Sequence, residues 1–269
     1  MKQPVVIIGL GEIGELFAHA FLKLGHPVFP VLRTTSMSDL AASVPDPALV
    51  LVAVTEDSLQ SVLADLPTPW RSSVALVQNE LLPRDWQPHV PQDPTVIVVW
   101  FDKKKGRPLV SVLPTLAVGV RAPMVVDALQ RVGIPARVID PDERLFEMVR
   151  KNLYILTINI AGLRSGGNVS ELWQQHRTLA TGVAHEILDI QASLAAQSLP
   201  REALIEAMVE AFEGDPQHIC LGRSGPGRLD RARRQAREVQ IPTPWLDAIA
   251  AENTPPNSEG AAARPVTLA

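Results

Sequence analysis

The sequence has one cysteine, no long apolar run and no large excess of charge, and each of these absences excludes a class of protein. A single cysteine, Cys220, cannot form an internal disulfide, which is typical of a reducing compartment. No apolar run reaches the ~18–20 residues that a membrane-spanning helix needs, and the N-terminus lacks the basic start and apolar core of a signal peptide. The formal net charge of −4 gives no overall attraction to nucleic acid or anionic lipid. We therefore expect a cytoplasmic protein without nucleic-acid or membrane partners.

The first 140 residues alternate short apolar runs with helical patterns. Apolar runs without polar alternation predict strands that are buried on both faces. The expected strands are Val5–Ile8, Val28–Leu32, Leu49–Val54, Val74–Val77, Val96–Trp100, Leu109–Leu113 and Ala136–Val138. The expected helices are Ile13–Leu24, Ser58–Leu66 and Ala122–Val132. This alternation favours a mainly parallel sheet with right-handed crossovers.

The pattern becomes helical from Asp142 onwards. The segment that follows Asn152 is apolar almost all round, which is typical of a buried helix. Further helices are expected at Ser170–Ala195, Arg201–Glu213 and Leu229–Val239. Residues 251–269 are rich in proline, alanine and small polar residues, and they predict a flexible tail.

The stretch VVIIGLGEIG, residues 5–14, is a strand-like run followed by three spaced glycines and a helical pattern. In this context Gly9 allows a tight turn, Gly11 lets the backbone approach a pyrophosphate, and Gly14 lets the helix pack on the strand. The helix N-terminus would offer unpaired N–H groups to the phosphates. The alternative is a structural turn without a ligand. The expected cofactor cradle is Gly9, Leu10, Gly11, Glu12, Ile13 and Gly14.

The second expected strand ends in Arg33 rather than in an acidic residue. An NAD site usually has Asp or Glu about 20 residues after the glycines to hold the ribose 2′-hydroxyl. An arginine can instead pair with a 2′-phosphate, with the hydroxyl of Thr34 beside it. The cofactor expected is therefore NADP(H); the alternative is that Arg33 is a solvated charge at a strand end. The fold class is then α/β, with an N-terminal Rossmann dinucleotide-binding domain over residues 1–140 followed by an all-helical C-terminal domain over 141–250.

Four segments together resemble the ketopantoate reductase (2-dehydropantoate 2-reductase) family as far as Ala250. They are VVIIGLGEIGELFAHAFLKLGHPVFPVLR, LVQNELLP, RKNLYILTINIAGL and ARRQAREVQIPTPWLDAI. The resemblance implies an active site in the cleft between an NADPH-binding domain and a helical domain that also serves dimerisation. It implies that Lys151 is the general acid, which agrees with the lowered pKa that a lysine acquires in a partly dry cleft. The alternative for Lys151 is a surface lysine near the start of a helix.

The resemblance also implies roles for other polar residues. Asn79 matches a residue near the nicotinamide and the reacting carbonyl, although it is also typical of a loop cap. Asn159 matches the second asparagine of the family's helix, and its amide in an apolar segment needs a hydrogen-bond partner from the protein or a ligand. Thr55 ends the third strand, near the cofactor, where the family often has lysine. We therefore expect Lys151, Asn79 and Asn159 to be catalytic and Thr55 to contact the cofactor.

The substrate side departs from the family pattern. Ile155 replaces the first helix asparagine, Glu80 replaces the glycine of a Gln-Asn-Gly segment, and a late Ser…Glu pair has no clear match. Counting back from Pro244 places Ser224 near the missing glutamate. Sites that bond a substrate hydroxyl reject analogues strongly, so these losses argue against ketopantoate as the substrate.

The loop GRSGPGR, residues 222–228, offers two arginines for an anionic substrate, Arg223 and Arg228. We expect Arg223 and Ser224 as substrate residues. Four more arginines are expected on the solvated face of the last helix: Arg231, Arg233, Arg234 and Arg237. His218 and Cys220 form no metal-ligand set, so no metal is expected.

The sequence thus predicts an NADPH-dependent reductase of a 2-oxo acid or a related carbonyl compound other than ketopantoate. The expected partner is a small, anionic carbonyl substrate, and a homodimer is compatible with the helical dimerisation domain that the resemblance implies. Two alternatives stay open: an NADP(H)-binding or sensing protein that has lost catalysis, and an opine-type dehydrogenase that reduces an imine.

Overall fold

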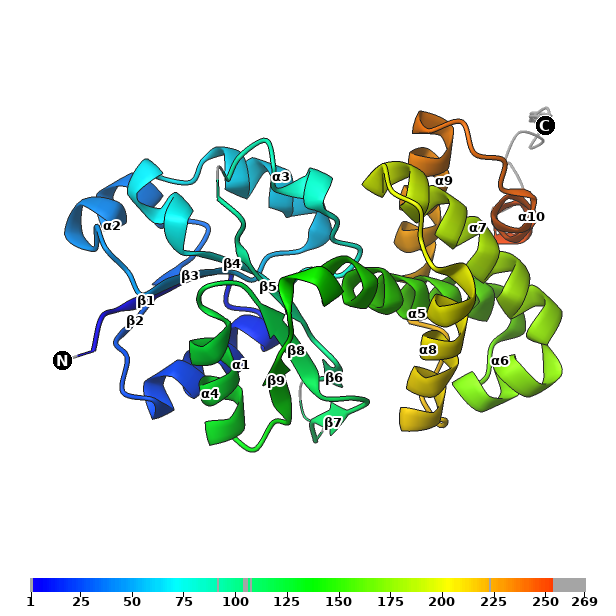
Figure 1. Cartoon of the computed structure of the whole chain (residues 1–269), viewed down its shortest axis with the longest axis horizontal. Helices are drawn as coiled ribbons and strands as arrows, with labels where there is room; N and C mark the ends of the chain where they lie inside the picture. The colour runs from blue at the N-terminus through cyan, green and yellow to red at the C-terminus, as the bar shows by residue number, and fades with distance from the viewer. Residues whose placement is uncertain (1, 91, 104–105, 107, 223, 254–269) are drawn as a thin grey trace, which may run out of the picture.

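The computed structural model describes residues 2–90, 92–103, 106, 108–222 and 224–253. Figure 1 shows a sheet with flanking helices in the N-terminal half and a group of helices in the C-terminal half, with α5 (Arg144–Ser165) reaching from one to the other. Among the described residues, none of the helices combines the length and apolar character that crossing a membrane requires.

A seven-stranded sheet forms the N-terminal half, with the strand order β2-β1-β3-β4-β5-β8-β9. Its strands are β1 (Val5–Ile8), β2 (Val28–Val31), β3 (Leu49–Val52), β4 (Val74–Leu76), β5 (Thr95–Val98), β8 (Thr115–Val118) and β9 (Ala136–Val138). The first five run parallel, β8 pairs antiparallel with β5, and β9 pairs parallel with β8. The sheet is therefore mainly parallel, as the strand–helix alternation predicts.

Helices cover both faces of the sheet (Figure 1). They are α1 (Glu12–Lys23) and α4 (Ala122–Arg131) on one face, and α2 (Met37–Ser43), α3 (Glu56–Ala64) and the 3₁₀ helix η1 (Thr68–Ser73) on the other. Val5 and Ile7 pack into the core beneath α1 and α4, whereas Val6 and Ile8 pack into the opposite core. This explains why β1 is apolar at every position, since successive side chains point to opposite faces.

The segment after β5 differs from the prediction. The expected strand Leu109–Leu113 is only β7 (Val110–Ser111), which pairs with β6 (Phe101–Asp102) in a separate two-stranded ribbon. The sheet strand is instead β8, directly after Pro114, which was not predicted. Val110 is 46% exposed, whereas every residue of β8 is buried. Both stretches are apolar, so hydropathy alone does not distinguish them.

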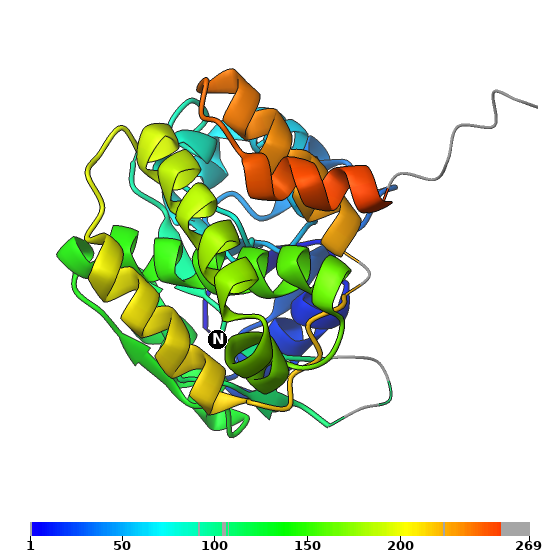
Figure 2. The ribbon, with the colours of Figure 1, turned by 90° about the vertical axis from the view of Figure 1, so that its right-hand side faces the viewer.

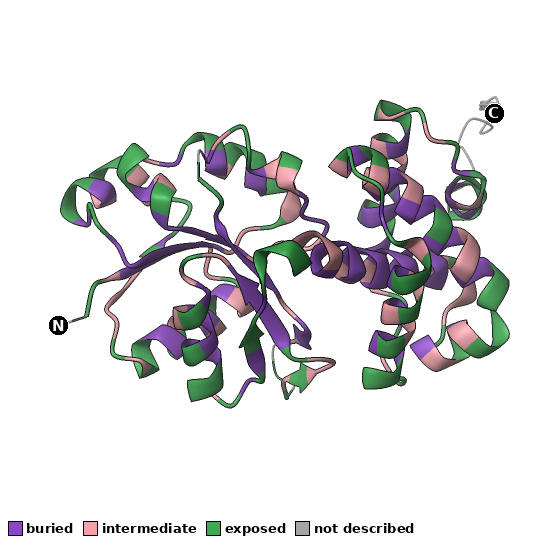
Figure 3. Ribbon diagram, in the orientation of Figure 1, coloured by how far each residue is buried: buried purple, intermediate pink, exposed green. Residues whose placement is uncertain are grey.

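The C-terminal half packs around α5. Its other helices are α6 (Val169–Gln175), α7 (Arg177–Ala195), α8 (Arg201–Gly214), α9 (Gly225–Glu238) and α10 (Pro244–Asn253), and short 3₁₀ turns η2 (Pro83–Asp85) and η3 (Pro141–Glu143) precede the helical half. Figure 2 shows α7, α8, α9 and α10 grouped about α5. Figure 3 shows burial continuing from the sheet into α5, which agrees with the prediction of a buried helix.

Two helix boundaries correct the sequence prediction. The expected helix Ser170–Ala195 is interrupted at His176, whose φ of −123° and ψ of 32° separate α6 from α7. α10 was not predicted and ends at Asn253, so residues 251–253 belong to a helix and not to the expected tail. Residues 254–269 lie outside the described residues, and the domain limits at 140 and 250 stay a prediction.

Candidate functional site

The glycine turn after β1 lies at the carboxyl edge of the sheet. Gly9 has φ +93°, and a Cβ added there would lie 2.7 Å from the carbonyl oxygen of Ala53 at the end of β3. A Cβ at Gly14 would overlap the carbonyl oxygen of Gly9. These two glycines are therefore required by the packing of β1, β3 and α1, as the motif predicts.

Gly11 differs from its two neighbouring glycines. A Cβ placed there would meet nothing within 4 Å, and its backbone is extended at the N-terminal cap of α1. The space beside Gly11 is thus open, and the first-turn N–H groups of α1 have no intrahelical partner. This cradle fits a dinucleotide pyrophosphate. Leu10 and Ile13 pack against the core beneath α1, and Glu12 is half-buried in the first helical turn.

The turn after β2 holds the residues expected to select the cofactor. The hydroxyl of Thr35 accepts a hydrogen bond from the Leu32 N–H at 3.1 Å, and Ser36 caps α2. Arg33 and Thr34 are exposed at the tip of this turn. Within the described part of the chain Arg33 forms no ion pair, so its guanidinium is available to a phosphate.

The ends of β3 and β4 are joined by a residue that sequence reasoning missed. Gln78 Nε2 donates to the carbonyl oxygens of Val52 at 2.7 Å and Val54 at 3.2 Å. Thr55 is exposed at the start of α3, and its hydroxyl lies 3.2 Å from that of Ser58. Gln78 therefore fixes the strand ends between the glycine turn and the segment that follows β4.

Asn79 follows β4 and lies against α5 of the helical half. Its amide nitrogen donates to Glu56 Oε1 at 3.2 Å. Asn79 and Gln78 line a cavity of about 10 Å³ together with Lys151 and Asn152 of α5. That volume is the size of a single water molecule, and the cavity is lined by both Asn79 and Lys151.

Lys151 projects from α5 onto an aromatic surface. Its Nζ lies 4.5 Å from the ring centroid of Trp100 and 5.4 Å from that of Tyr154. Burial lowers the pKa of Lys151 to about 7, the positive charge of Arg228 acts in the same direction, and Asp102 opposes both. A lysine with such a pKa exchanges protons near neutral pH. The alternative of an ordinary surface lysine does not describe this environment.

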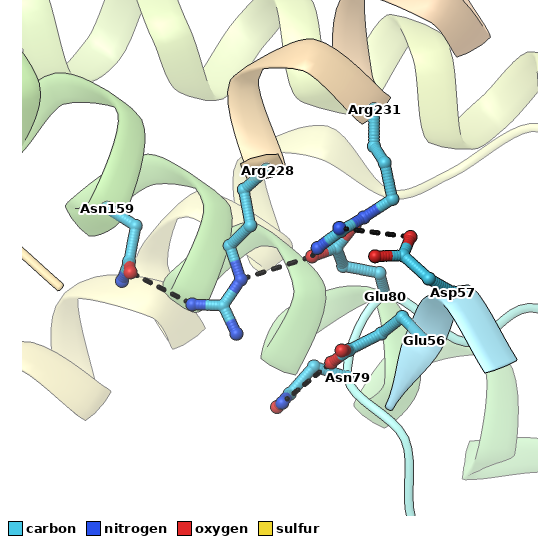
Figure 4. Close-up of polar contacts among 7 residues, drawn as sticks. All are labelled: Glu56, Asp57, Asn79, Glu80, Asn159, Arg228 and Arg231. Atoms are coloured by element: carbon cyan, nitrogen blue, oxygen red, sulfur yellow. Dashed lines mark hydrogen bonds and ion pairs between the residues drawn. The ribbon is translucent and has the colours of Figure 1, made fainter. Parts of the chain in front are cut away.

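A charged cluster joins the two halves (Figure 4). Glu80, after β4, accepts hydrogen bonds from Arg228 Nε at 3.1 Å and from Arg231 Nε and Nη2 at 3.0 and 2.8 Å. Arg231 also reaches Asp57 at 3.4 Å, and Arg228 Nη1 donates to Asn159 Oδ1 at 2.9 Å. The partner that Asn159 needs is thus Arg228. Arg231 was expected on the solvated face of the last helix. Its side chain is only 16% exposed, because its guanidinium is paired with the Glu80 carboxylate.

Glycines of the GRSGPGR loop bring α9 against α5. A Cβ at Gly222 would lie 2.8 Å from Asn159 Oδ1, and one at Gly225 would lie 3.1 Å from the Asn159 carbonyl oxygen. This close approach buries Arg228 beside Asn159. The loop was expected to bind substrate through Arg223 and Ser224. Ser224 is exposed at the start of α9, and Arg223 lies outside the described residues.

Glu80 and Arg228, at two positions that depart from the family pattern, are therefore hydrogen-bonded to each other. Glu80 has φ 62°, a backbone conformation that glycine adopts readily, and its carboxylate lies on Arg228. An acid in place of a glycine and an unmatched arginine were the signal that could have revealed the pair. Ile155 packs at the edge of the hydrophobic core and supplies no hydrogen-bonding side chain. Within the described part of the chain, no three His, Cys, Asp or Glu side chains gather as a metal site.

The sequence matches no protein-family model and no curated protein sequence. Solved structures do match over almost the whole chain. The 2-dehydropantoate 2-reductase of Methylococcus capsulatus has a TM-score of 0.68 at 14% identity, covering 93% of this chain and 95% of its own. This chain has the ketopantoate reductase fold. The predicted fold class, a Rossmann domain followed by a helical domain, is confirmed.

Two further structures share this fold. A dimeric ketopantoate reductase from Staphylococcus aureus has a TM-score of 0.61 at 18% identity, covering 93% of this chain and 96% of its own. A D-mandelate dehydrogenase, in a ternary structure with NADH and anilino(oxo)acetate, has a TM-score of 0.62 at 13% identity, covering 92% of this chain and 96% of its own. At these identities the likeness to ketopantoate reductases is one of fold, and the activity must be argued from the site.

Proposed function

We propose that this chain is a divergent relative of the ketopantoate reductases and reduces a 2-oxo acid or related carbonyl compound with a nicotinamide cofactor. The observation that carries the proposal is the position of Lys151. Its amine, with a pKa of about 7, lines the same cavity as Asn79, next to the carboxyl edge of the sheet that holds the open glycine cradle. In open α/β sheets, ligands bind at this edge.

Several residues of the sheet half would hold the cofactor. The open backbone at Gly11 and the N-terminus of α1 would receive the pyrophosphate. Arg33 and Thr34 would bind a 2′-phosphate, which makes NADPH the proposed cofactor rather than NADH. Thr55, exposed between β3 and α3, would also contact the cofactor. The bound cofactor would supply the hydride.

Lys151 would supply the proton. Below pH 7 its amine is mostly an ammonium, held over the Trp100 ring, and can protonate the carbonyl oxygen as the hydride arrives. Asn79 and Asn159 would orient the substrate from the two sides of the cleft. Ile155 offers no polar group there, and for this reason ketopantoate is not the proposed substrate.

The proposal is tested by turnover. Purified protein is mixed with NADPH and, separately, with a panel of 2-oxo acids, aldehydes and cyclic imines, and the loss of NADPH absorbance is followed. We expect oxidation with at least one 2-oxo acid. Lys151→Met should lower it by about 10³-fold while NADPH binding, measured by fluorescence titration, persists. The exposed Lys23, at the end of α1, provides the matched control Lys23→Met, which should change neither quantity.

A second candidate is an NADP(H)-binding protein without catalysis. The observation that favours it is that Asn159 Oδ1 and the Glu80 carboxylate are bonded to Arg228 within the protein itself. Tight NADPH binding without oxidation by any member of the panel would support this candidate. A homodimer also stays a prediction, which light scattering of the purified protein would check.

A further inference from the structure

The cluster at the junction of the two halves places two arginines, Arg228 and Arg231, on the buried carboxylate of Glu80. The Glu80 side chain is 7% exposed and is the one carboxylate on Arg228 among the described residues. Arg231 shares that carboxylate, and Asp57, which also reaches Arg231, is 73% exposed. The charge of Arg228 is felt at Lys151, where it lowers the pKa. Arg228 and Lys151 therefore form a positive region, in which Glu80 faces Arg228 and the charge of Asp102 acts on Lys151.

The guanidinium of Arg228 is fixed on one side and free on the other. Nε is bonded to Glu80 and Nη1 to Asn159 Oδ1. Among the described residues Nη2 has no hydrogen-bond partner, and the Arg228 side chain is 8% exposed. Figure 4 shows this nitrogen pointing away from Glu80 and Arg231. The amide nitrogen of Asn159 likewise has no partner among the described residues.

The two donors, Arg228 Nη2 and the Asn159 amide, fit a carboxylate, and the charge of Arg228 acts on the Lys151 amine. A planar guanidinium with its remaining N–H groups fixed loses little freedom when it binds an anion. In a 2-oxo acid the carboxylate is bonded directly to the reacting carbonyl carbon. Such a substrate therefore needs two neighbouring donors, one for the carbonyl oxygen and one for the carboxylate. Lys151 and Arg228 supply this pair from α5 and α9.

We propose that Arg228 binds the substrate carboxylate through Nη2, with the Asn159 amide as a second donor, so that the substrate class is the 2-oxo acids. This inference rests on the proposed function and names its substrate class. Glu80 is a positioning residue, because it orients the guanidinium from the side away from the substrate. An uncharged ketone would leave the free side of Arg228 without a partner.

The test compares Arg228→Gln with Arg231→Gln. Both changes remove one arginine from Glu80 and leave the other in place, so Glu80 keeps a cationic partner in each variant. Only Arg228 faces the proposed substrate position. For each protein, kcat/KM is measured with NADPH and pyruvate, 2-oxobutyrate and phenylglyoxylate, and with the amide of the best acid as an uncharged analogue. The affinity for oxalate is measured by calorimetry on the NADP⁺ complex, which needs no turnover.

For Arg228→Gln we expect kcat/KM for the acid to fall about 30- to 100-fold, mainly through KM, which is the size of a lost charged hydrogen bond. The amide should change less than threefold, and oxalate affinity should fall by a factor similar to that of the acid. Arg231→Gln should leave the ratio of acid to amide unchanged. Equal losses for acid and amide, or the same loss of selectivity in Arg231→Gln, would overturn the carboxylate role.

The two proposals fail separately. Oxalate binding that depends on Arg228, in a protein that oxidises no NADPH, would support carboxylate binding by Arg228 and reject the proposed reductase activity. Turnover of 2-oxo acids that Arg228→Gln leaves unchanged would support the reductase activity and reject carboxylate binding by Arg228. An absence of oxalate binding to the wild-type NADP⁺ complex would also reject carboxylate binding by Arg228.

Discussion

The cofactor edge and the substrate side of this molecule are built differently. At the proposed cofactor edge, a Cβ at Gly11 would meet nothing within 4 Å, and Arg33 forms no ion pair among the described residues. On the substrate side, Glu80, Arg228 and Asn159 are bonded to one another across the two halves. The first site is prepared by backbone shape and the second by side-chain charge, so substitutions should affect them in different ways.

The largest effect on stability is expected from the contrast between two glycines of one turn. Gly14→Ala should destabilise the protein by about 3 kcal/mol or more, because its Cβ overlaps the Gly9 carbonyl oxygen. Gly11→Ala should change the stability by less than about 1 kcal/mol, because nothing lies within 4 Å. It should nevertheless weaken NADPH binding by roughly 100-fold, since the methyl group fills the phosphate position. Urea unfolding and fluorescence titration measure the two quantities.

Equal stability losses in the two glycine variants would contradict the open cradle. So would an unchanged NADPH affinity in Gly11→Ala, because the cofactor would then bind elsewhere.

On the substrate side, Lys151→Met should lower kcat by about 10³-fold, within the range for loss of a general acid. The same change should raise the free energy of unfolding at pH 7 by about 1–3 kcal/mol, because burial disfavours the ammonium. The pKa of Lys151 is about 7 in the folded protein and 10.5 when exposed. Between these pH values the unfolded chain binds more protons, so wild-type stability rises with pH, and this rise should vanish in Lys151→Met. Urea unfolding at several pH values checks it, with Lys23→Met as control.

Arg33→Asp should change the preference for NADPH over NADH at the proposed cofactor edge. An acid there would repel a 2′-phosphate and accept a hydrogen bond from a ribose hydroxyl. We expect the dissociation constant of NADPH to rise about 30-fold, while that of NADH stays the same or falls. Stability should change little because Arg33 is exposed. A protein that preferred NADH before the substitution would show that Arg33 is a solvated charge.

The smallest effect concerns pH. In the proposed reaction Lys151 acts in its protonated form, so kcat/KM for reduction should be flat below pH 7 and fall about tenfold per pH unit above it. Oxidation of the corresponding hydroxy acid should show the opposite slope. A reduction rate that rises above pH 7 would exclude Lys151 as the proton donor.

The same contrast explains what the sequence could predict. The glycine turn was predictable because its constraints are local: Gly9 and Gly14 contact neighbouring backbone within one motif. The Glu80–Arg228 pair was not, because its members lie 148 positions apart and meet only when α9 packs on α5. Lys151 needed the family resemblance, since its position over Trp100 depends on a loop from the other half. β8 was missed because two apolar runs flank Pro114, and only tertiary packing decides which enters the sheet.

A crystal structure of the protein with NADP⁺ and oxalate tests the central claim most directly. The pyrophosphate should lie on the Gly11 backbone, and one oxalate oxygen should lie within hydrogen-bond distance of Lys151 Nζ, about 2.7–3.2 Å. The opposite carboxylate should lie on Arg228 Nη2. A nicotinamide ring directed away from Lys151, or a dinucleotide bound away from the glycine turn, would contradict it.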